Sequence, residues 1–343
     1  MKRFVAILLP FLFLPPATAD VAPSNFVISK DKILLIGNLE KNGFAQLEGG
    51  PQIQLTGPTE SFVSTASIDS DGNFLVFGSG AVATTIDNPP ASAPLNPDNV
   101  VVTPQSITRG NATQIWRWKI STSGEVLEAK GVEVGFPVWV KSAFGNLIAG
   151  SVATESGIAG FYLNWDGVTS KLNLIGKNSS EINVVLNNNY LAGSSAEKLL
   201  GKNLAAKRDG ILYKISKPNL VRSSNLNAER RWISGTSNYF LGGSAIVGKK
   251  TEAVVTKFTS NFAPTWTTRF PAIGPAKVVA AKKNFMAVFA TNGGKISIIT
   301  FDSRGKIIGR KSIMGSEISA FGYSDEIGAV ILANGSLNRL TSR

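Results

Sequence analysis

A short hydrophobic run that ends in glycine or alanine and is followed by a small or polar residue occurs seven times along the chain. The glycine or alanine, which we call the repeat marker, lies at positions 37, 78, 150, 193, 243, 290 and 333, at successive spacings of 41, 72, 43, 50, 47 and 43 residues. A run such as Leu147-Ile148-Ala149 before Gly150 is apolar at consecutive positions, which predicts a strand buried on both faces. Repeats of roughly 40–50 residues made of short strands are typical of β-propeller blades.

The long spacing contains a proline-rich stretch, residues 81–113, with prolines at positions 89, 90, 94, 97 and 104. Proline cannot donate to a β ladder, so we expect a loop inserted into the second unit. Without its 33 residues that spacing is 39, close to the others.

Each unit divides into four strand segments. In the third unit, for example, 138–143 precedes the marker strand, 161–165 follows it, and the turn Asp166-Gly167 leads to an outer strand. We therefore predict an all-β fold, a β-propeller of seven four-stranded blades with almost no helix. The seventh unit stops at Arg343, just after its third strand, so the last blade is expected to be incomplete or closed by the segment after Asp20. Six blades plus an irregular segment is the alternative.

The fifth unit carries the most detailed pattern, with Tyr239-Phe240-Leu241-Gly242-Gly243-Ser244, then Glu252-Ala253-Val254-Val255-Thr256-Lys257-Phe258, and Trp266 in its outer strand. It resembles the repeat of bacterial secreted seven-bladed β-propeller repeat proteins, and Lys119 and Lys214 share the position of Lys257. The resemblance covers units two to six. It implies a propeller fold and an export context, but no activity, because the fold does not fix the function.

The N-terminus has the pattern of an export signal. Lys2 and Arg3 precede an apolar stretch, 4–16, and Ala17-Thr18-Ala19 offers the small residues that a signal peptidase accepts. Thirteen apolar residues are too few to span a membrane, which needs about 20. We expect a signal peptide at 1–19, a propeller domain at 20–343 without a transmembrane segment, and a protein that is secreted or held in the cell envelope.

The composition limits the catalytic and metal-binding chemistry that the chain can perform. The chain has no cysteine and no histidine, which excludes disulfides, thiolate catalysis and a Ser-His-Asp triad, and removes the commonest zinc ligand. A sequence that begins like a calcium loop, Asp69-Ser70-Asp71-Gly72-Asn73, has Gly80 where the pattern requires a bidentate glutamate. We predict no cofactor, no metal site and no catalytic residues.

The net charge of +12 favours an anionic partner. In a four-stranded blade, the connections from strand two to strand three and those between blades emerge on the same face. Eight cations of units four and five fall in or beside such connections: Lys198, Lys202, Lys207, Arg208, Arg230, Arg231, Lys249 and Lys250. We predict that they form a ligand-binding surface, although a solvated rim of charge explains them about as well.

Two functions fit these observations. The first is a monomeric, non-enzymatic binding or scaffold propeller for an anionic polymer or an acidic protein surface. The second is an extracellular carbohydrate-active enzyme that uses Asp, Glu or Tyr. The sequence contains no paired acidic motif of the kind that a glycosidase needs, which favours the first.

Overall fold

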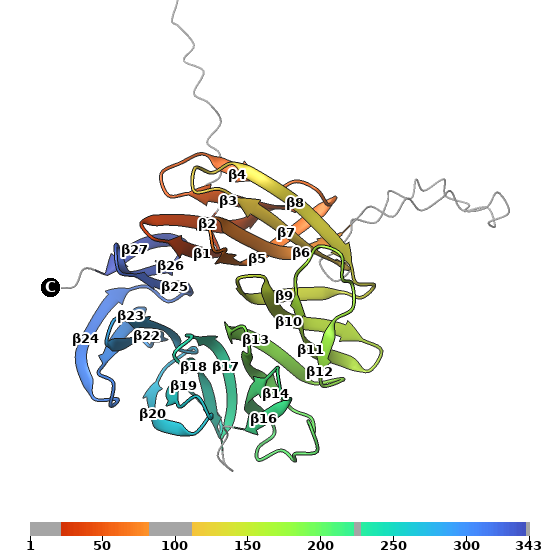
Figure 1. Cartoon of the computed structure of the whole chain (residues 1–343). Helices are drawn as coiled ribbons and strands as arrows, with labels where there is room; N and C mark the ends of the chain where they lie inside the picture. The colour runs from red at the N-terminus through yellow and green to blue at the C-terminus, as the bar shows by residue number, and fades with distance from the viewer. Residues whose placement is uncertain (1–21, 82–111, 223–227, 341–343) are drawn as a thin grey trace, which may run out of the picture.

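A computed structural model describes residues 22–81, 112–222 and 228–340, which form 27 β-strands in seven antiparallel sheets and no helix (Figure 1). The sheets are the blades of one ring, and six of them have four strands. Blade 1 consists of β1 (Asn25–Ser29), β2 (Lys32–Leu39), β3 (Asn42–Leu47) and β4 (Gln52–Gln54). Blade 2 consists of β5 (Glu60–Ile68), β6 (Phe74–Ala81), β7 (Gln114–Ile120) and β8 (Val126–Glu133). Blade 3 consists of β9 (Val138–Phe144), β10 (Leu147–Thr154), β11 (Gly157–Asn164) and β12 (Asn173–Ile175).

The second half of the chain repeats the pattern. Blade 4 consists of β13 (Ser180–Asn187), β14 (Tyr190–Ser195), β15 (Asp209–Lys214) and β16 (Asn219–Arg222). Blade 5 consists of β17 (Glu229–Gly235), β18 (Phe240–Val247), β19 (Lys250–Phe258) and β20 (Pro264–Pro271). Blade 6 consists of β21 (Lys277–Ala281), β22 (Asn284–Thr291), β23 (Lys295–Phe301) and β24 (Ile307–Met314), and blade 7 of β25 (Ile318–Ser324), β26 (Gly328–Ala333) and β27 (Ser336–Leu340).

The predicted seven-bladed, all-β propeller is confirmed, and the six-bladed alternative is wrong. In every blade the marker strand is the second strand, as expected for its unbroken apolar run. Among the described residues, helices long and apolar enough to cross a membrane are absent. The predicted signal peptide and most of the proline-rich loop lie outside the described residues, but Ala81 ends β6 and Ala112 is buried just before β7.

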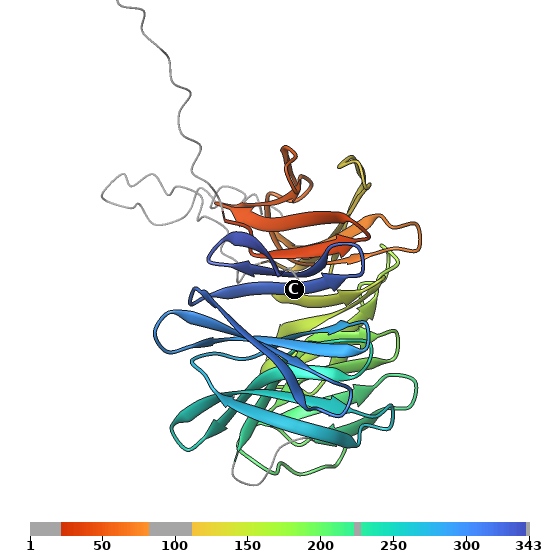
Figure 2. The same ribbon diagram turned by 90° about the vertical axis from the view of Figure 1, so that its left-hand side faces the viewer.

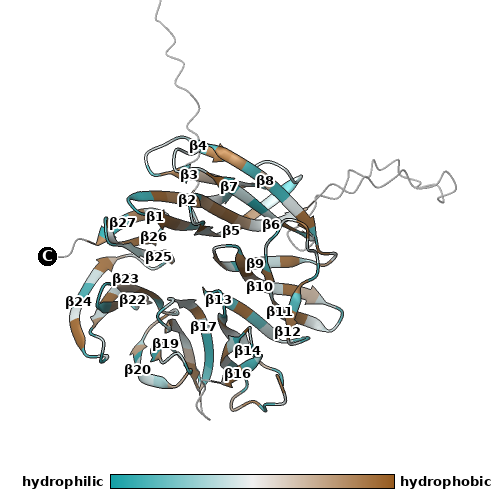
Figure 3. Ribbon diagram, viewed as in Figure 1, coloured by the Kyte–Doolittle hydropathy of each residue, from teal (hydrophilic) through white to brown (hydrophobic). Residues whose placement is uncertain are grey.

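The core lies between the blades. The described residues contain seven clusters of buried hydrophobic side chains, and each joins one pair of neighbouring blades. In the cluster between blades 4 and 5, Trp232 of β17 packs with Val184 of β13 and Leu212 of β15. Figure 3 shows the hydrophobic positions in brown along middle strands such as β2, β6 and β22. The apolar marker strands are therefore the surfaces on which the blades stack.

Packing of this kind also closes the ring. Within the described residues blade 7 has three strands, which confirms that it is incomplete, while β1 pairs with β2 and is the innermost strand of blade 1. Phe26 and Ile33 of blade 1 pack with Val330 and Leu332 of blade 7. Figure 2 shows the ribbons of these two blades, in orange-red and dark blue, side by side. The Ser324 hydroxyl also donates to the Lys30 carbonyl oxygen at 2.8 Å. The segment after Asp20 thus begins blade 1, and the two end blades meet mainly through side chains.

The repeat marker is glycine in blades 2 to 5 because the innermost strand bulges over it. In blade 4, Ile182 pairs with Gly193 and Val184 with Ala192, so that Asn183 is an extra residue. A Cβ on Gly193 would lie 2.0 Å from the Glu181 carbonyl oxygen, and the marker glycines of blades 2, 3 and 5 meet such an oxygen at 1.9–2.3 Å. Only glycine fits this approach without a shift of the backbone.

Blades 6 and 7 have alanine as the marker. In blade 6 the pairing of β21 with β22 ends at Lys277 and Val288, so β21 does not extend over the methyl group of Ala290. Blade 7 has a bulge at Ser319 and tolerates Ala333. In blades 2 to 5 the marker glycine therefore accompanies a close approach of the innermost strand, whereas in blade 1, which has no bulge, a Cβ on Gly37 would meet the Phe44 ring at 2.6 Å.

The seven innermost strands line a central channel of the ring. Side chains of these strands form hydrogen bonds with the backbone of the next blade around it. The Asn25 amide donates to the Ser64 carbonyl oxygen at 3.0 Å, and Ser64 in turn bonds to blade 3. Asn183 donates to the Trp232 carbonyl oxygen at 3.0 Å, and the Ser234 hydroxyl accepts from the Val278 N–H at 3.0 Å. These bonds fix the innermost strands relative to one another, which holds the channel wall in place.

Candidate functional site

The strand directions place the eight predicted cations on one face of blades 4 and 5, which we call the basic face. β14 and β18 both end there, so the connection 196–208 and the turn 248–249 that follow them emerge together. β17 begins on the same face, and the Arg230 N–H donates to the Arg208 carbonyl oxygen at 3.0 Å. The described ends of the proline-rich loop, Ala81 and Ala112, also lie on this face.

Five of the eight cations are exposed, and their side chains have no ion pair or hydrogen bond within the described residues: Lys198, Lys207, Arg231, Lys249 and Lys250. Lys202 is exposed too, but its ammonium bonds to the Leu220 carbonyl oxygen and lies 3.4 Å from Asn219 Oδ1. It therefore anchors its loop to β16 while it adds to the positive charge of the surface.

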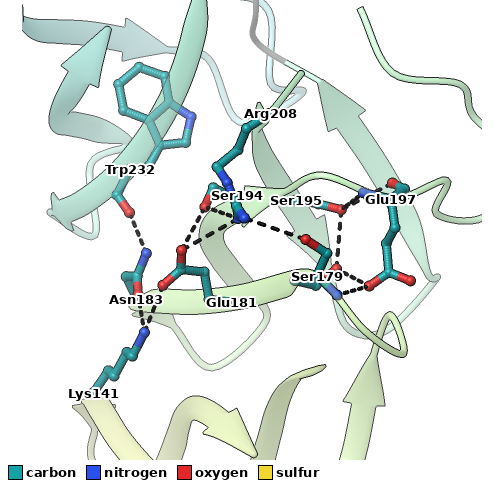
Figure 4. A network of polar contacts seen from close by, with 10 residues as sticks. Lys141, Ser179, Glu181, Asn183, Ser194, Ser195, Glu197, Arg208 and Trp232 are labelled. Atoms are coloured by element: carbon teal, nitrogen blue, oxygen red, sulfur yellow. Dashed lines mark hydrogen bonds and ion pairs between the residues drawn. The ribbon is translucent and has the colours of Figure 1, made fainter. Parts of the chain in front are cut away.

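Arg208 holds the connection 196–208 to β13. Its Nη1 lies 3.5 Å from Glu181 Oε1 and 3.4 Å from the Ser194 hydroxyl, and its Nη2 lies 3.4 Å from the Ser179 hydroxyl (Figure 4). With the guanidinium engaged on three sides, Arg208 positions the loop that carries Lys198 and Lys207.

Arg230 is only 4 % exposed and points into the interface between blades 4 and 5, on the same side of β17 as buried Trp232. Burial lowers the pKa of its guanidinium, as does the nearby charge of Arg269, while Glu252 acts in the opposite direction. Arg230 contributes charge beneath the basic face but cannot contact a ligand on it without a rearrangement. Whether these eight residues bind anything stays a prediction.

The carboxylate of Glu197 is held by the loop that enters blade 4. It accepts hydrogen bonds from the backbone N–H groups of Lys177, Asn178 and Ser179 at 3.0–3.2 Å and from the Ser180 hydroxyl at 2.7 Å. Burial alone would raise the pKa of Glu197, but these bonds bring it below its ordinary value. The bonds hold the ionised carboxylate against the loop 177–180, and it forms no ion pair with the adjacent Lys198.

Glu181 forms a second network that reaches the central channel (Figure 4). Its Oε2 lies 2.8 Å from the Lys141 ammonium, which is also 3.1 Å from Asn183 Oδ1. Burial would raise the pKa of Glu181, but the charges of Lys141 and Arg208 lower it overall. Both Lys141 and Asn183 are the extra residues of bulges, so the bulge is what turns them toward each other.

Sequence reasoning missed these networks because their members come from different blades. Lys141 and Glu181 are 40 residues apart, and neither belongs to a motif. The signal that could have found them is the marker glycine, since Gly150 and Gly193 accompany the bulges that carry Lys141 and Asn183.

The structure also explains the Asp69 turn. Asp69 Oδ1 accepts from the N–H groups of Asp71 and Asn73 at 2.9 Å, and Oδ2 lies 2.8 Å from the Lys119 ammonium. The carboxylate thus closes a turn between two strands. Across the described ranges there is no group of three or more Asp or Glu residues that could hold a metal ion.

No protein-family model matches the chain, and no curated protein matches its sequence. Solved structures do resemble it. Hydrazine synthase of Kuenenia stuttgartiensis has a TM-score of 0.56 at 7 % identity, over 97 % of this chain and 99 % of that one. The Dos1 propeller has a TM-score of 0.53 at 12 % identity, over 92 % of this chain and 78 % of that one.

A third similar structure, from a study of two prolyl endopeptidases, has a TM-score of 0.53 at 12 % identity, over 90 % of this chain and 45 % of that one. At these identities the similarity shows the propeller fold alone. The resemblance to secreted bacterial repeat proteins beyond that fold stays a prediction.

Proposed function

We propose that this protein is a non-enzymatic binding or scaffold propeller that is exported and takes an anionic polymer on its basic face. The observation that supports this most directly is an imbalance of free charge. Five cations face solvent without a side-chain partner in the described residues, whereas four of the carboxylates around them are engaged within the protein and only Glu229, at the start of β17, is not.

Four of these carboxylates have internal contacts. Glu197 binds a backbone loop, and Glu181 lies between Lys141 and Arg208. Buried Asp209 accepts from the N–H groups of Ala205 and Ala206 at 2.9 and 3.0 Å, and Glu252 Oε2 lies 3.4 Å from Arg269 Nε. The exposed cations are therefore left without a direct ion pair, and on a chain with a net charge of +12 such a patch attracts polyanions through its field.

The size of the patch favours a polymer over a small ion. Its charges come from three separate segments of two blades: the connection 196–208, the start of β17 and the turn before β19. Isolated exposed ion pairs each contribute about 0–1 kcal/mol, so a useful affinity needs several contacts at once, which a chain of repeated negative charges provides.

Binding of fluorescent polyphosphate, measured by anisotropy at several salt concentrations, tests the proposal. Exposed charges are screened over about 10 Å at 0.1 M ionic strength, so affinity should fall steadily as salt is added. Neutral dextran of the same length should not bind. Binding of dextran as strong as that of polyphosphate, or binding that does not respond to salt, would refute the charge-based mechanism. If neither polymer binds and the protein binds an acidic protein instead, the partner of the basic face is a protein surface and not a polymer.

The alternative, a carbohydrate-active enzyme, needs two carboxyl groups roughly 5–10 Å apart around the scissile bond. Glu181, the carboxylate whose network reaches the channel, is instead fixed by two cations. An assay for reducing ends released from acidic polysaccharides separates the two functions. Release by the purified protein that is lost in Glu181→Gln would favour the enzyme.

Export is tested separately. Mass spectrometry of the protein recovered from the envelope or medium of the producing cells should find Asp20 as the first residue. A protein that retains Met1 and stays in the cytoplasm would contradict the proposed setting.

A further inference from the structure

The ring encloses a central cavity of about 370 Å³, a channel into which all seven innermost strands place residues. The lining is mainly polar, with hydroxyl and amide groups from several blades. Lys141 of β9 and Lys277 of β21 are the two charged side chains that line it within the described residues. Since Glu181 pairs with Lys141, the net positive charge of the cavity comes from the Lys277 ammonium.

The two lysines differ in their partners. Lys141 is paired with Glu181 at 2.8 Å and with Asn183 at 3.1 Å. The Lys277 side chain has no hydrogen bond or ion pair within the described part of the chain, although it is half-buried at the start of the innermost strand β21, where its backbone pairs with Val288 of β22. Burial is the cause that lowers the pKa of its ammonium. A buried ammonium without a counter-charge costs free energy, which an anion in the cavity would recover.

Hydroxyl groups fixed in the same wall complete the set of donors. The Ser142 oxygen accepts from the Val185 N–H at 2.9 Å, and the Ser234 oxygen accepts from the Val278 N–H at 3.0 Å. Ser319, the extra residue of the bulge in blade 7, adds a third hydroxyl from the neighbouring side of the ring. The bond from Val185 leaves the O–H of Ser142 available to donate into the cavity.

We propose that the central channel is a binding site for one small oxyanion, a carboxylate or phosphate group, with the Lys277 ammonium as its main contact. The hydroxyl groups of Ser142 and Ser319 donate around it, while Ser234, whose hydroxyl donates to the Val278 carbonyl oxygen at 3.4 Å, fixes the wall beside Lys277. The ion supplies the counter-charge that Lys277 lacks, and charge-assisted hydrogen bonds are the strongest available in such a wall. This site is separate from the basic face, and its ligand is a single group rather than a polymer.

The site should respond to pH in a defined direction. The charged groups that face Lys277 across the cavity are Lys141 and, through it, Glu181. An anion favours the protonated form of Lys277, so anion binding raises the lowered pKa of that lysine. By the same linkage, affinity for the anion decreases as pH rises through the pKa of Lys277 in the free protein.

NMR titration of the full protein labelled with ¹³C in its lysines tests the proposal, since each Cε resonance reports one ammonium. Lys277 is assigned by its absence from Lys277→Met, a variant that removes a buried charge and should remain folded. Inorganic phosphate and acetate should shift the Lys277 resonance and raise its pKa, and acetamide, the neutral analogue of acetate, should do neither. Phosphate affinity should fall about tenfold or more in Lys277→Met, the loss of one charge-assisted contact.

Lys283→Met, which removes an exposed cation from the turn before β22, is the matched control and should bind phosphate like the parent. Equal loss in both variants, or a Lys277 resonance that phosphate does not move, would overturn the proposal. The result is independent of the basic face, because Lys277→Met should keep its salt-dependent affinity for polyphosphate. Loss of polyphosphate binding with phosphate binding intact would refute the polymer function and leave the channel site standing.

Discussion

Blades 4 and 6 both bring polar side chains to the central channel, but their innermost strands do so differently. In blade 4 a bulge turns the extra residue Asn183 toward Lys141, and the strand passes so close to Gly193 that a side chain there has no space. In blade 6 the pairing of β21 with β22 ends two residues before Ala290, which leaves room for its methyl group, and Lys277 of β21 faces the channel without an ion pair among the described residues. The same repeat thus produces a neutralised lysine in one place and an unpaired lysine in another, depending on the local backbone.

The strongest test of this difference is the marker residue itself. In Gly193→Ala the new Cβ would lie 2.0 Å from the Glu181 carbonyl oxygen, so the backbone of β13 or β14 must move. We expect a loss of about 3 kcal/mol or more in the free energy of unfolding, measured by denaturant titration. The converse change in blade 6, Ala290→Gly, should lower the free energy of unfolding by only about 1 kcal/mol, as glycine in a strand usually does relative to alanine. Similar losses in both variants would show that the bulge does not require glycine.

A second test concerns the loop that enters blade 4. Glu197→Gln keeps the shape of the side chain but weakens the four bonds that its carboxylate accepts, and should cost about 1–2 kcal/mol at neutral pH. The folded-state pKa of Glu197 lies below its ordinary value of 4.5, so this contribution is present above pH 4.5 and disappears as pH falls through the folded-state value.

The matched control is Glu155→Gln, because Glu155 is exposed in a turn of blade 3 and its side chain has no hydrogen bond or ion pair among the described residues. This variant should unfold like the parent at every pH. A Glu197→Gln variant that is as stable as the parent at pH 7 would mean that the loop does not depend on the charge.

The smallest effect is expected for Lys277→Met. The folded-state pKa of Lys277 is below its ordinary value of 10.5, so the folded protein releases this proton more readily than the unfolded chain. The variant should therefore be more stable than the parent at neutral pH in buffers without small anions, and the difference should shrink as pH approaches 10.5. Thermal denaturation at pH 7 and pH 10 measures it. A variant less stable than the parent at pH 7 would indicate a counter-charge for Lys277.

The sequence revealed the architecture because a propeller repeats one local pattern. The runs that end at Gly150 and Gly193 are the second strands of their blades, and the spacing between markers predicted the number of blades. Strand direction follows from strand order, so the shared face of Lys198 and Lys249 could be predicted as well.

Side-chain partners could not be predicted in the same way. Nothing in the sequence separates exposed Arg231 from buried Arg230, because the orientation of each depends on which neighbour β17 packs against. The bulges that direct Asn183 and Lys141 depend on two paired strands at once. Their only sign in the sequence is the marker glycine on the second strand. Burial of Lys277 depends on all seven innermost strands meeting around it.

The central claim, that the basic face binds an anionic polymer, is tested most directly by two charge reversals of equal size. Lys249→Glu with Lys250→Glu changes the exposed turn before β19 on the basic face, and Lys282→Glu with Lys283→Glu changes the exposed turn before β22 on the opposite face. Polyphosphate affinity at 0.1 M salt should fall about tenfold or more in the first variant, since two favourable contacts become repulsive. It should change little in the second, which lies beyond the screening length of about 10 Å. Equal losses in both variants would show that net charge drives the attraction and would contradict a site on the basic face.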